Sequence, residues 1–244
     1  MVAGRCIKLF ALRMKDILSY NEVVAREGFN IQKGMNFRPK AKNYSILLMS
    51  VRENAPYNDG FDETGEVLFY EGEDVTKRET KEPKNFDQPF FTKTGKLANN
   101  GAFFRAVEDF KLGRRKNPER IQVYEKISNN IWSDAGWFYL TNAEYRKSDT
   151  ENRKVFKFIL SPQPVTELKD RFEVEEFEFS RRIPTIVKRE VWERDEGKCI
   201  RCGLDKNLHF DHVIPWSRGG SSTDPKNIQI LCGKHNLKKS DKII

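Results

Sequence analysis

A cluster of cysteine and histidine residues near the C-terminus constrains this chain most. Three of its 4 cysteines and all 3 histidines lie between residues 199 and 235. The pairs Cys199-x-x-Cys202 and Cys232-x-x-His235 lie about thirty residues apart, a spacing typical of a tetrahedral zinc site. So short a segment cannot bury enough apolar surface to fold alone, and metal binding would supply much of its folding free energy. We therefore predict a structural zinc ion on these four residues.

A second set of polar residues lies between the two zinc pairs. Asp211 and His212 occupy a segment, residues 210–215, that alternates polar and apolar residues like a short strand. Neighbouring strand residues point to opposite faces, so the carboxylate can bind a hard cation while the imidazole reaches a water molecule. Metal-assisted hydrolysis of a phosphodiester needs such a base and such a cation. The sequence therefore predicts a catalytic metal centre beside the zinc site.

These residues, with Asn227 and Asn236 after them, resemble the HNH nucleases, the ββα-metal group with an added zinc site. The resemblance covers residues 183–242. It implies that His212 is the general base and that Asp211 binds a catalytic divalent ion, Mg²⁺ or Mn²⁺. It also implies that Asn227 holds the His212 ring through its backbone carbonyl.

The last position of the signature has two interpretations, because His235 and Asn236 are adjacent. We place His235 on zinc and Asn236 on the catalytic cation, which preserves a closed four-ligand zinc site. The alternative places His235 on the catalytic cation and leaves zinc with three cysteines. Residues 236–239 are predicted to begin a helix. On this helix, Lys238 and Lys239 either meet a phosphate or form a solvated basic face.

The charge of the chain agrees with a nucleic-acid enzyme. It has 44 Lys and Arg against 36 Asp and Glu, a net charge of +8. From Arg181 onward there are 14 basic and 8 acidic residues, so +6 of the excess lies there. A basic surface attracts the phosphate backbone without selecting a sequence. No apolar run is long enough to span a membrane, and no signal-peptide pattern is present, so we expect a cytoplasmic protein of prokaryotic type.

The remaining residues have room for one larger domain. A proline-rich step at 161–164 follows a strand-like run, so we expect a domain over 1–160, a linker over 161–180 and the nuclease over 181–244. Many short strands with few helices favour an α+β protein whose N-terminal domain is of β-barrel type with flanking helices. The expected helices are 21–26, 99–110 and 186–195, and the expected strands are 44–51, 66–70, 121–125, 137–140 and 155–160.

The order of several short segments in the N-terminal domain is also informative; they are residues 55–60, 67–72, 87–89, 99–101, 120–125, 136–138 and 154–158. This succession resembles the SRA domain of the PUA superfamily over residues 35–160. The resemblance implies a domain that flips a modified cytosine out of duplex DNA into a pocket. By position, Tyr57 and Tyr70 would stack on the base, and Asp59 would accept a hydrogen bond from its exocyclic amine.

Together the two segments predict a modification-dependent restriction-type endonuclease that recognises 5-methylcytosine or 5-hydroxymethylcytosine by base flipping and cuts double-stranded DNA nearby. Each HNH centre cuts one strand, so a double-strand break calls for a homodimer or for two binding events. Three alternatives stay open. The chain is a nuclease or nickase whose N-terminal domain reads sequence or another modification, a non-catalytic reader of modified DNA, or an enzyme directed to RNA.

Overall fold

A computed structural model describes residues 17–51, 55, 57–62, 65–162, 181–240 and 242. Most of the expected linker, residues 161–180, lies outside the described residues. So does the first half of residues 1–34, the segment that precedes the SRA resemblance. No helix among the described residues is long and apolar enough to cross a membrane.

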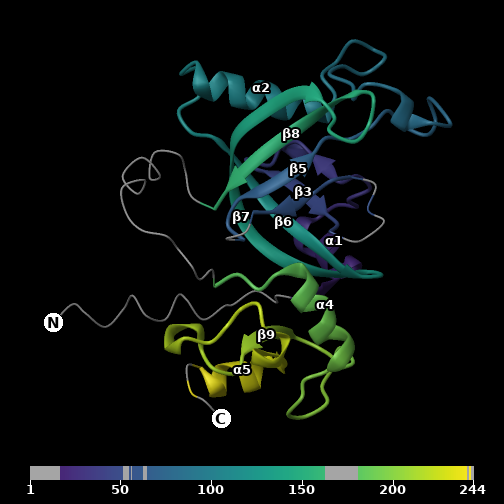
Figure 1. The fold of residues 1–244 in the computed structure, drawn as a ribbon. Coiled ribbons are helices and arrows are strands. Elements are labelled where there is room, and N and C mark those ends of the chain that lie inside the picture. The colour runs from purple at the N-terminus through teal and green to yellow at the C-terminus, as the bar shows by residue number, and fades with distance from the viewer. Residues whose placement is uncertain are drawn as a thin grey trace.

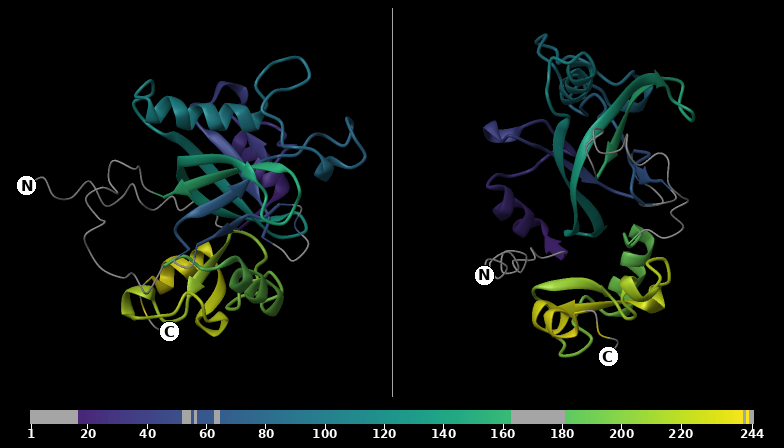
Figure 2. Two further views of the ribbon diagram at one scale, coloured as in Figure 1. Left: turned by 45° about the horizontal axis from the view of Figure 1, so that its top comes forward. Right: turned by 90° about the vertical axis from the view of Figure 1, so that its left-hand side faces the viewer.

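One curved sheet of eight strands forms the N-terminal domain (Figures 1 and 2). Its order is β2-β3-β6-β7-β8-β5-β4, and β1 pairs with β7. Only the β3–β6 pair is parallel among the described strands. The strands are β1 (Ile17–Ser19), β2 (Met35–Asn36), β3 (Ser45–Met49), β4 (Gly60–Phe61), β5 (Leu68–Glu71), β6 (Glu119–Ser128), β7 (Ile131–Lys147) and β8 (Lys154–Ser161).

Two helices pack on this sheet. The first, α1 (Tyr20–Glu27), begins at a capping box between Ser19 and Glu22 and ends at Gly28, whose φ of 77° suits glycine. The second, α2 (Asn99–Lys111), lies across one face of the sheet (Figure 2). It buries Phe103 and Val107 against apolar residues of β5 to β8. Two short 3-10 turns, η1 (Pro39–Ala41) and η2 (Pro83–Asn85), lie in the loops.

The C-terminal module has its own core. Helix α4 (Thr185–Arg194) precedes a two-stranded antiparallel hairpin of β9 (Leu208–His212) and β10 (Ile228–Cys232), and α5 (Gly233–Lys239) follows it. The 3-10 turns η3 (Trp216–Arg218) and η4 (Pro225–Asn227) lie between the two strands. Apolar residues of α4 and of the hairpin pack into one cluster, which also includes Ile17 of β1. This strand–strand–helix unit is the ββα arrangement that the sequence predicted.

The structure confirms the α+β class, and the differences from the expected elements are in their ends. The expected strands at 121–125 and 137–140 are parts of the longer β6 and β7. The expected strand 210–215 ends at His212, because the chain turns there into the loop that carries η3. Helix α5 begins at Gly233 instead of near Asn236, so both residues of the His235-Asn236 pair are helical.

The two parts meet where α4 packs against β6 (Figure 1). Lys188 of α4 donates to Glu125 of β6 at 2.5 Å, and the Thr185 hydroxyl donates to the same carboxylate. Burial alone would raise the pKa of Glu125, but the Lys188 ammonium and the Thr185 hydroxyl lower it, so the pair stays charged. Arg182 stacks on the rings of Phe61 and Phe138. Removing one partner of a buried ion pair such as Lys188–Glu125 is strongly destabilising. The contacts between α4 and β6 therefore hold the two parts together.

Candidate functional site

The four predicted zinc ligands converge at one point of the C-terminal module. Their ligand atoms, three sulfurs and one ring nitrogen, all lie within 4.8 Å of one another. Cys202 Sγ is 3.9 Å from Cys232 Sγ, and His235 Nδ1 is 3.5 Å from Cys199 Sγ. Tetrahedral zinc with Zn–S bonds of about 2.3 Å requires sulfurs roughly 3.8 Å apart. The donor set and its spacing therefore fit zinc, with His235 among the ligands.

The local backbone prepares the first of these ligands. Burial would raise the pKa of the Cys199 thiol, but N–H groups of Cys232, Arg201 and Cys202 and the His235 ring outweigh it and lower the pKa to about 6. A thiolate is the form that binds zinc. The turn around Cys199 therefore favours the metal-binding state before any ion arrives.

The predicted catalytic residues lie on the two strands and the helix beside this cluster. Asp211 and His212 end β9, opposite Gln229 and Ile228 of β10. Asn236 is buried on α5, which packs against both strands. Carboxylate and amide oxygens are the ligands that Mg²⁺ and Mn²⁺ prefer, so Asp211 and Asn236 suit a hard divalent cation. Such an ion would polarise the phosphate and stabilise the leaving oxygen.

The surroundings of His212 lower the pKa of its ring. Burial lowers its pKa below the ordinary 6.5, and Arg181 and Lys239 lower it further, against the opposing charge of Asp211. The imidazole is therefore neutral at physiological pH and able to accept a proton.

Asn227 has a different role from the expected one. The sequence predicted that its backbone carbonyl holds the His212 ring. In the structure this carbonyl accepts from the Val213 N–H at 2.7 Å. Its side chain accepts from the Ile214 N–H and donates to the Ile214 and Ser221 carbonyls. Among the hydrogen bonds of the described residues, those of Asn227 reach the loop that follows His212 and none reaches the His212 ring, because β9 ends at His212 and the chain turns back over Asn227.

The partner of the ring is Ser222, a residue that sequence reasoning missed. His212 Nε2 lies 2.9 Å from Ser222 Oγ, and Ser222 is 5% exposed. Two residues before Ser222, the loop packs closely against Ile214. Only glycine fits at position 220, since a Cβ there would lie 1.8 Å from the Ile214 carbonyl oxygen. A buried hydroxyl on Nε2 fixes the orientation of the ring.

Replacing Ser222 with alanine should reduce the cleavage rate by about 2- to 10-fold, the value of one lost hydrogen bond. Thermal unfolding and zinc content should stay close to those of the wild type. Threonine keeps a hydroxyl and should restore part of the rate. Single-turnover cleavage across pH tests this, and an unchanged rate and pH profile in Ser222→Ala would show that Ser222 does not position the base.

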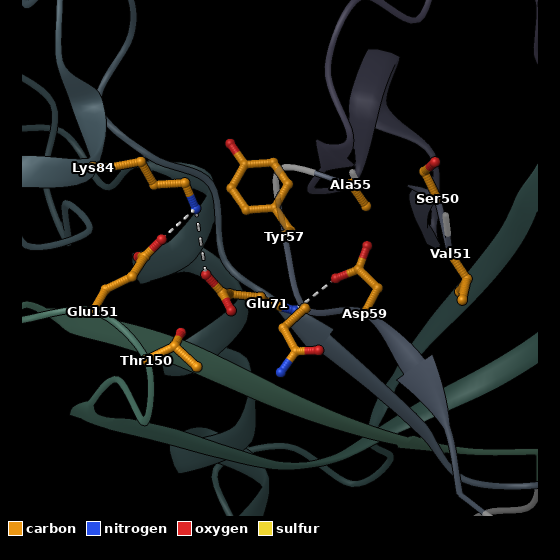
Figure 3. Close-up of a pocket in the computed structure, with 10 residues that line it drawn as sticks. Ser50, Val51, Ala55, Tyr57, Asp59, Glu71, Lys84, Thr150 and Glu151 are labelled. Atoms are coloured by element: carbon orange, nitrogen blue, oxygen red, sulfur yellow. Dashed lines mark hydrogen bonds and ion pairs between the residues drawn. The ribbon is translucent and has the colours of Figure 1, made fainter. Parts of the chain in front are cut away.

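The N-terminal domain holds a cavity of about 310 Å³ near the end of β3 (Figure 3). Tyr57, Asp59 and Glu71 line it, together with Lys84 and Glu151. Figure 3 shows the Lys84 ammonium between the Glu71 and Glu151 carboxylates, and it also lies 5.0 Å from the Tyr57 ring centroid. Ser50 Oγ, at the cavity wall, is buried and has no hydrogen-bond partner in the described part of the chain. An unsatisfied buried hydroxyl is rare and favours a ligand that completes it.

Asp59 is the most perturbed group in this cavity. Its Oδ1 accepts from the Glu71 N–H at 2.9 Å. Part of the residue reaches solvent through the cavity, yet the surrounding protein desolvates the carboxyl and raises its pKa to about 7, while the Glu71 N–H opposes that rise. Asp59 therefore exists in both protonation states near neutral pH. Burial also raises the pKa of Tyr57 to about 12, so its ring stays neutral.

The structure does not bring the three predicted base-binding residues into one cavity. Tyr70 is 2% exposed and belongs to the main hydrophobic core, because alternate residues of β5 face opposite sides. Its ring reaches a neighbouring hollow of about 430 Å³, which Tyr57 also lines. Tyr57 thus lies between Asp59 on one side and Tyr70 on the other. Glu71, the next residue along β5, enters the cavity of Asp59 instead.

A basic hollow of about 560 Å³ lies at the opposite end of β3. Four cations line it: Arg38, Arg115, Lys116 and Arg120. Arg38 and Arg115 both bind the buried Glu119 carboxylate. Arg120 lies flat on Trp137, with 3.8 Å from guanidinium carbon to ring centroid. These contacts hold Arg38, Arg115 and Arg120 in place, and the four cations outnumber the one carboxylate that they bind.

Comparison with known proteins finds one family model that matches the C-terminal residues. Residues 199–242 match the family model for HNH endonuclease. No curated protein matches the chain. Similar solved structures include an SUVH5 SRA domain bound to fully hydroxymethylated CG DNA, with 21% identity over 60% of this chain and 86% of that chain and a TM-score of 0.41.

Two restriction endonucleases are also similar over most of this chain. One is the modification-dependent endonuclease TagI, with 15% identity, coverage of 91% of this chain and 75% of that chain, and a TM-score of 0.40. The other is the type IV phosphorothioation-dependent endonuclease ScoMcrA, with 15% identity, coverage of 93% and 55%, and a TM-score of 0.41. The family match confirms the nuclease that the resemblance to HNH nucleases implied. Residues 199–242 of this chain are therefore similar to the HNH endonucleases.

Proposed function

We propose that this protein is a modification-dependent DNA endonuclease. It flips 5-methylcytosine or 5-hydroxymethylcytosine into the cavity of Tyr57 and Asp59 and cuts the DNA nearby. His212 is the general base, and a divalent cation, Mg²⁺ or Mn²⁺, binds Asp211 and Asn236. The observation that carries the proposal is the presence, in one chain with an HNH module, of a cavity with a raised-pKa carboxyl and an unsatisfied Ser50 hydroxyl.

The cavity suits a single flipped base. Its volume lies at the lower end of the range for ligand pockets, about 300–1,000 Å³. Tyr57 offers an aromatic face, and stacking contributes to holding an extruded base. The cytosine edge has an amine donor beside a ring-nitrogen acceptor. A protonated Asp59 matches both, since one oxygen accepts from the amine while the O–H donates to the ring nitrogen.

The basic hollow is the surface that we assign to the DNA backbone. Arginine and lysine contacts to phosphate give affinity and orientation without reading sequence. Arg115 and Arg120 are held rigidly, by Glu119 and by Trp137, and therefore lose little conformational freedom when they bind a phosphate.

In the proposed hydrolysis, neutral His212 removes a proton from the attacking water, and Ser222 keeps the ring oriented. A divalent cation held by Asp211 and Asn236 would supply charge stabilisation at the scissile phosphate. The Asn227 contacts hold the loop behind the base in a fixed position.

The test is cleavage of synthetic duplexes, with Mg²⁺ or Mn²⁺, that carry one defined modification each: none, 5-methylcytosine, 5-hydroxymethylcytosine or a phosphorothioate linkage. We expect cleavage of a cytosine-modified duplex and little cleavage of the unmodified one. Separating nicked from fully cut product shows whether one chain or two act on a site. Equal cleavage of all duplexes would overturn the proposal, and preference for the phosphorothioate would support the alternative reader. A structured RNA competitor that abolishes DNA cleavage would favour the RNA-directed alternative.

Asp59 variants test the cavity separately from the nuclease. Because the neutral carboxyl is the form that matches cytosine, affinity for modified duplex should be full below pH 7 and fall as pH rises through about 7. An asparagine side chain in its place would present the same donor and acceptor at every pH, so Asp59→Asn should bind without this pH dependence. Asp59→Ala should lose about 10- to 100-fold in affinity. Fluorescence anisotropy without divalent ions measures this, and a wild-type affinity that is constant from about pH 6 to 8 would argue against Asp59.

A further inference from the structure

Lys239, in the last turn of α5, is one of the most deeply buried side chains of the chain. It is 1% exposed, and its Nζ donates to the His212 carbonyl oxygen at 2.6 Å. The same nitrogen lies 2.9 Å from Asp211 Oδ2. Both partners belong to the proposed catalytic centre. The expected phosphate contact or solvated basic face is therefore wrong for Lys239, since the helix turns this side chain toward β9.

A buried ammonium is costly unless charged or polar partners compensate it. The partners of the Lys239 ammonium within the described residues are Asp211 and His212. The ammonium therefore links the Asp211 carboxylate to the His212 backbone carbonyl. Lys239 also lies one helical turn after Asn236, so the two residues face the same strand.

The contacts of Asp211 are concentrated on one oxygen. Oδ2 receives both the Lys239 ammonium and the Gln229 amide, the latter at 3.1 Å. In the described part of the chain, no hydrogen bond or ion pair reaches Oδ1. The Asp211 carboxylate is therefore held through Oδ2, and Oδ1 is left for a further ligand.

We propose that Lys239 is a positioning residue of the nuclease centre that also lowers its affinity for a divalent cation until DNA is bound. This proposal rests on the proposed function, in which Asp211 binds the catalytic divalent cation. Asp211 and Lys239 together have no net charge, and Asn236 adds none. A DNA phosphate would supply the missing negative charge, so cation and substrate should bind with mutual assistance.

The substitution Lys239→Met keeps the length of the side chain and removes the charge. Affinity of the zinc-loaded, DNA-free protein for Mn²⁺ should rise by about tenfold or more, because a positive charge close to the cation is gone. DNA cleavage should fall by about 10- to 100-fold, because Asp211 and the His212 backbone lose their common anchor. The two readouts therefore move in opposite directions. A lysine with a merely structural role would weaken both, since losing a support of a metal ligand ordinarily lowers metal affinity.

The measurements are Mn²⁺ titration by calorimetry, in the presence of bound zinc and without DNA, and single-turnover cleavage. Lys238→Met is the matched control, because it removes an exposed lysine from the same helix turn, and its Mn²⁺ affinity should equal that of the wild type. Lys239→Arg keeps the charge and should keep the low Mn²⁺ affinity, which provides a test if Lys239→Met does not fold.

Unchanged or weaker Mn²⁺ binding in Lys239→Met would overturn the proposal. So would Mn²⁺ affinity in Lys239→Arg as high as that expected for the methionine variant. Because Mn²⁺ is titrated without DNA, these outcomes are independent of which modification the protein recognises. If the wild type cuts no modified duplex, the proposed function fails. The effect of Lys239 on Mn²⁺ affinity is still measured by the titration, which needs no DNA.

Discussion

Replacing His212 with alanine should lower the rate of DNA cleavage by about 10²- to 10⁴-fold, the usual contribution of a general base. The reason is the geometry at the end of β9. Burial keeps the imidazole of this proposed base neutral, and the contact with Ser222 holds its ring in one orientation. Binding of modified duplex should be unchanged, because the Asp59 cavity lies in the other domain.

The measurement is single-turnover cleavage with enzyme in excess of DNA, with anisotropy as the control for binding. Zinc content and thermal unfolding of the variant should match the wild type, so that a loss of rate is a loss of chemistry. The double variant with Ser222→Ala should be no slower than His212→Ala alone, since the serine acts only through the ring. Wild-type cleavage by His212→Ala would show that another group is the base.

Removal of zinc should abolish cleavage by unfolding the C-terminal module. This module has a small apolar core from α4, β9 and β10, and its two zinc pairs lie on separate segments. Structural zinc contributes about 10–16 kcal/mol of folding free energy in modules of this kind, more than so small a core can replace. The N-terminal sheet has a separate core and should keep its fold and its affinity for modified DNA.

Chelation followed by calorimetry tests this, and the wild type should show one tightly bound zinc per chain. Cys199→Ser and Cys232→Ser should behave like the zinc-free protein. Cys6→Ser is the matched control, because Cys6 is the one cysteine outside the cluster, and it should keep both zinc and activity. Full cleavage by zinc-free protein would mean that the four residues are not a structural metal site.

The zinc site and the nuclease were predictable because their residues are close in the sequence. Two pairs with two intervening residues specify turns that present both ligands of a pair to one ion, whatever surrounds them. Asp211 and His212 are adjacent on a strand, so their opposite directions follow from strand geometry alone. The family match to residues 199–242 then confirmed the resemblance to HNH endonucleases that these residues carry.

The base cavity was less predictable. Tyr70 and Glu71 are neighbours, and the sequence cannot tell which of them faces the core, because that depends on the strands beside β5. The structure packs Tyr70 into the hydrophobic core and places Glu71 in the wall of the Asp59 cavity. Ser222 was missed for a similar reason, since its position opposite His212 depends on how the loop around Gly220 folds back.

The sequence by itself determined the candidate zinc ligands, the pair that we propose for the chemistry and the α+β class, since these follow from residue type and short-range backbone geometry. Only the tertiary structure decided which side chains meet across segments: Lys239 with Asp211, Ser222 with His212 and Lys188 with Glu125. The physical reason is burial. Whether a charged side chain is solvated or enclosed depends on the packing of distant segments, and that packing turns Lys239 from a surface lysine into part of the nuclease centre.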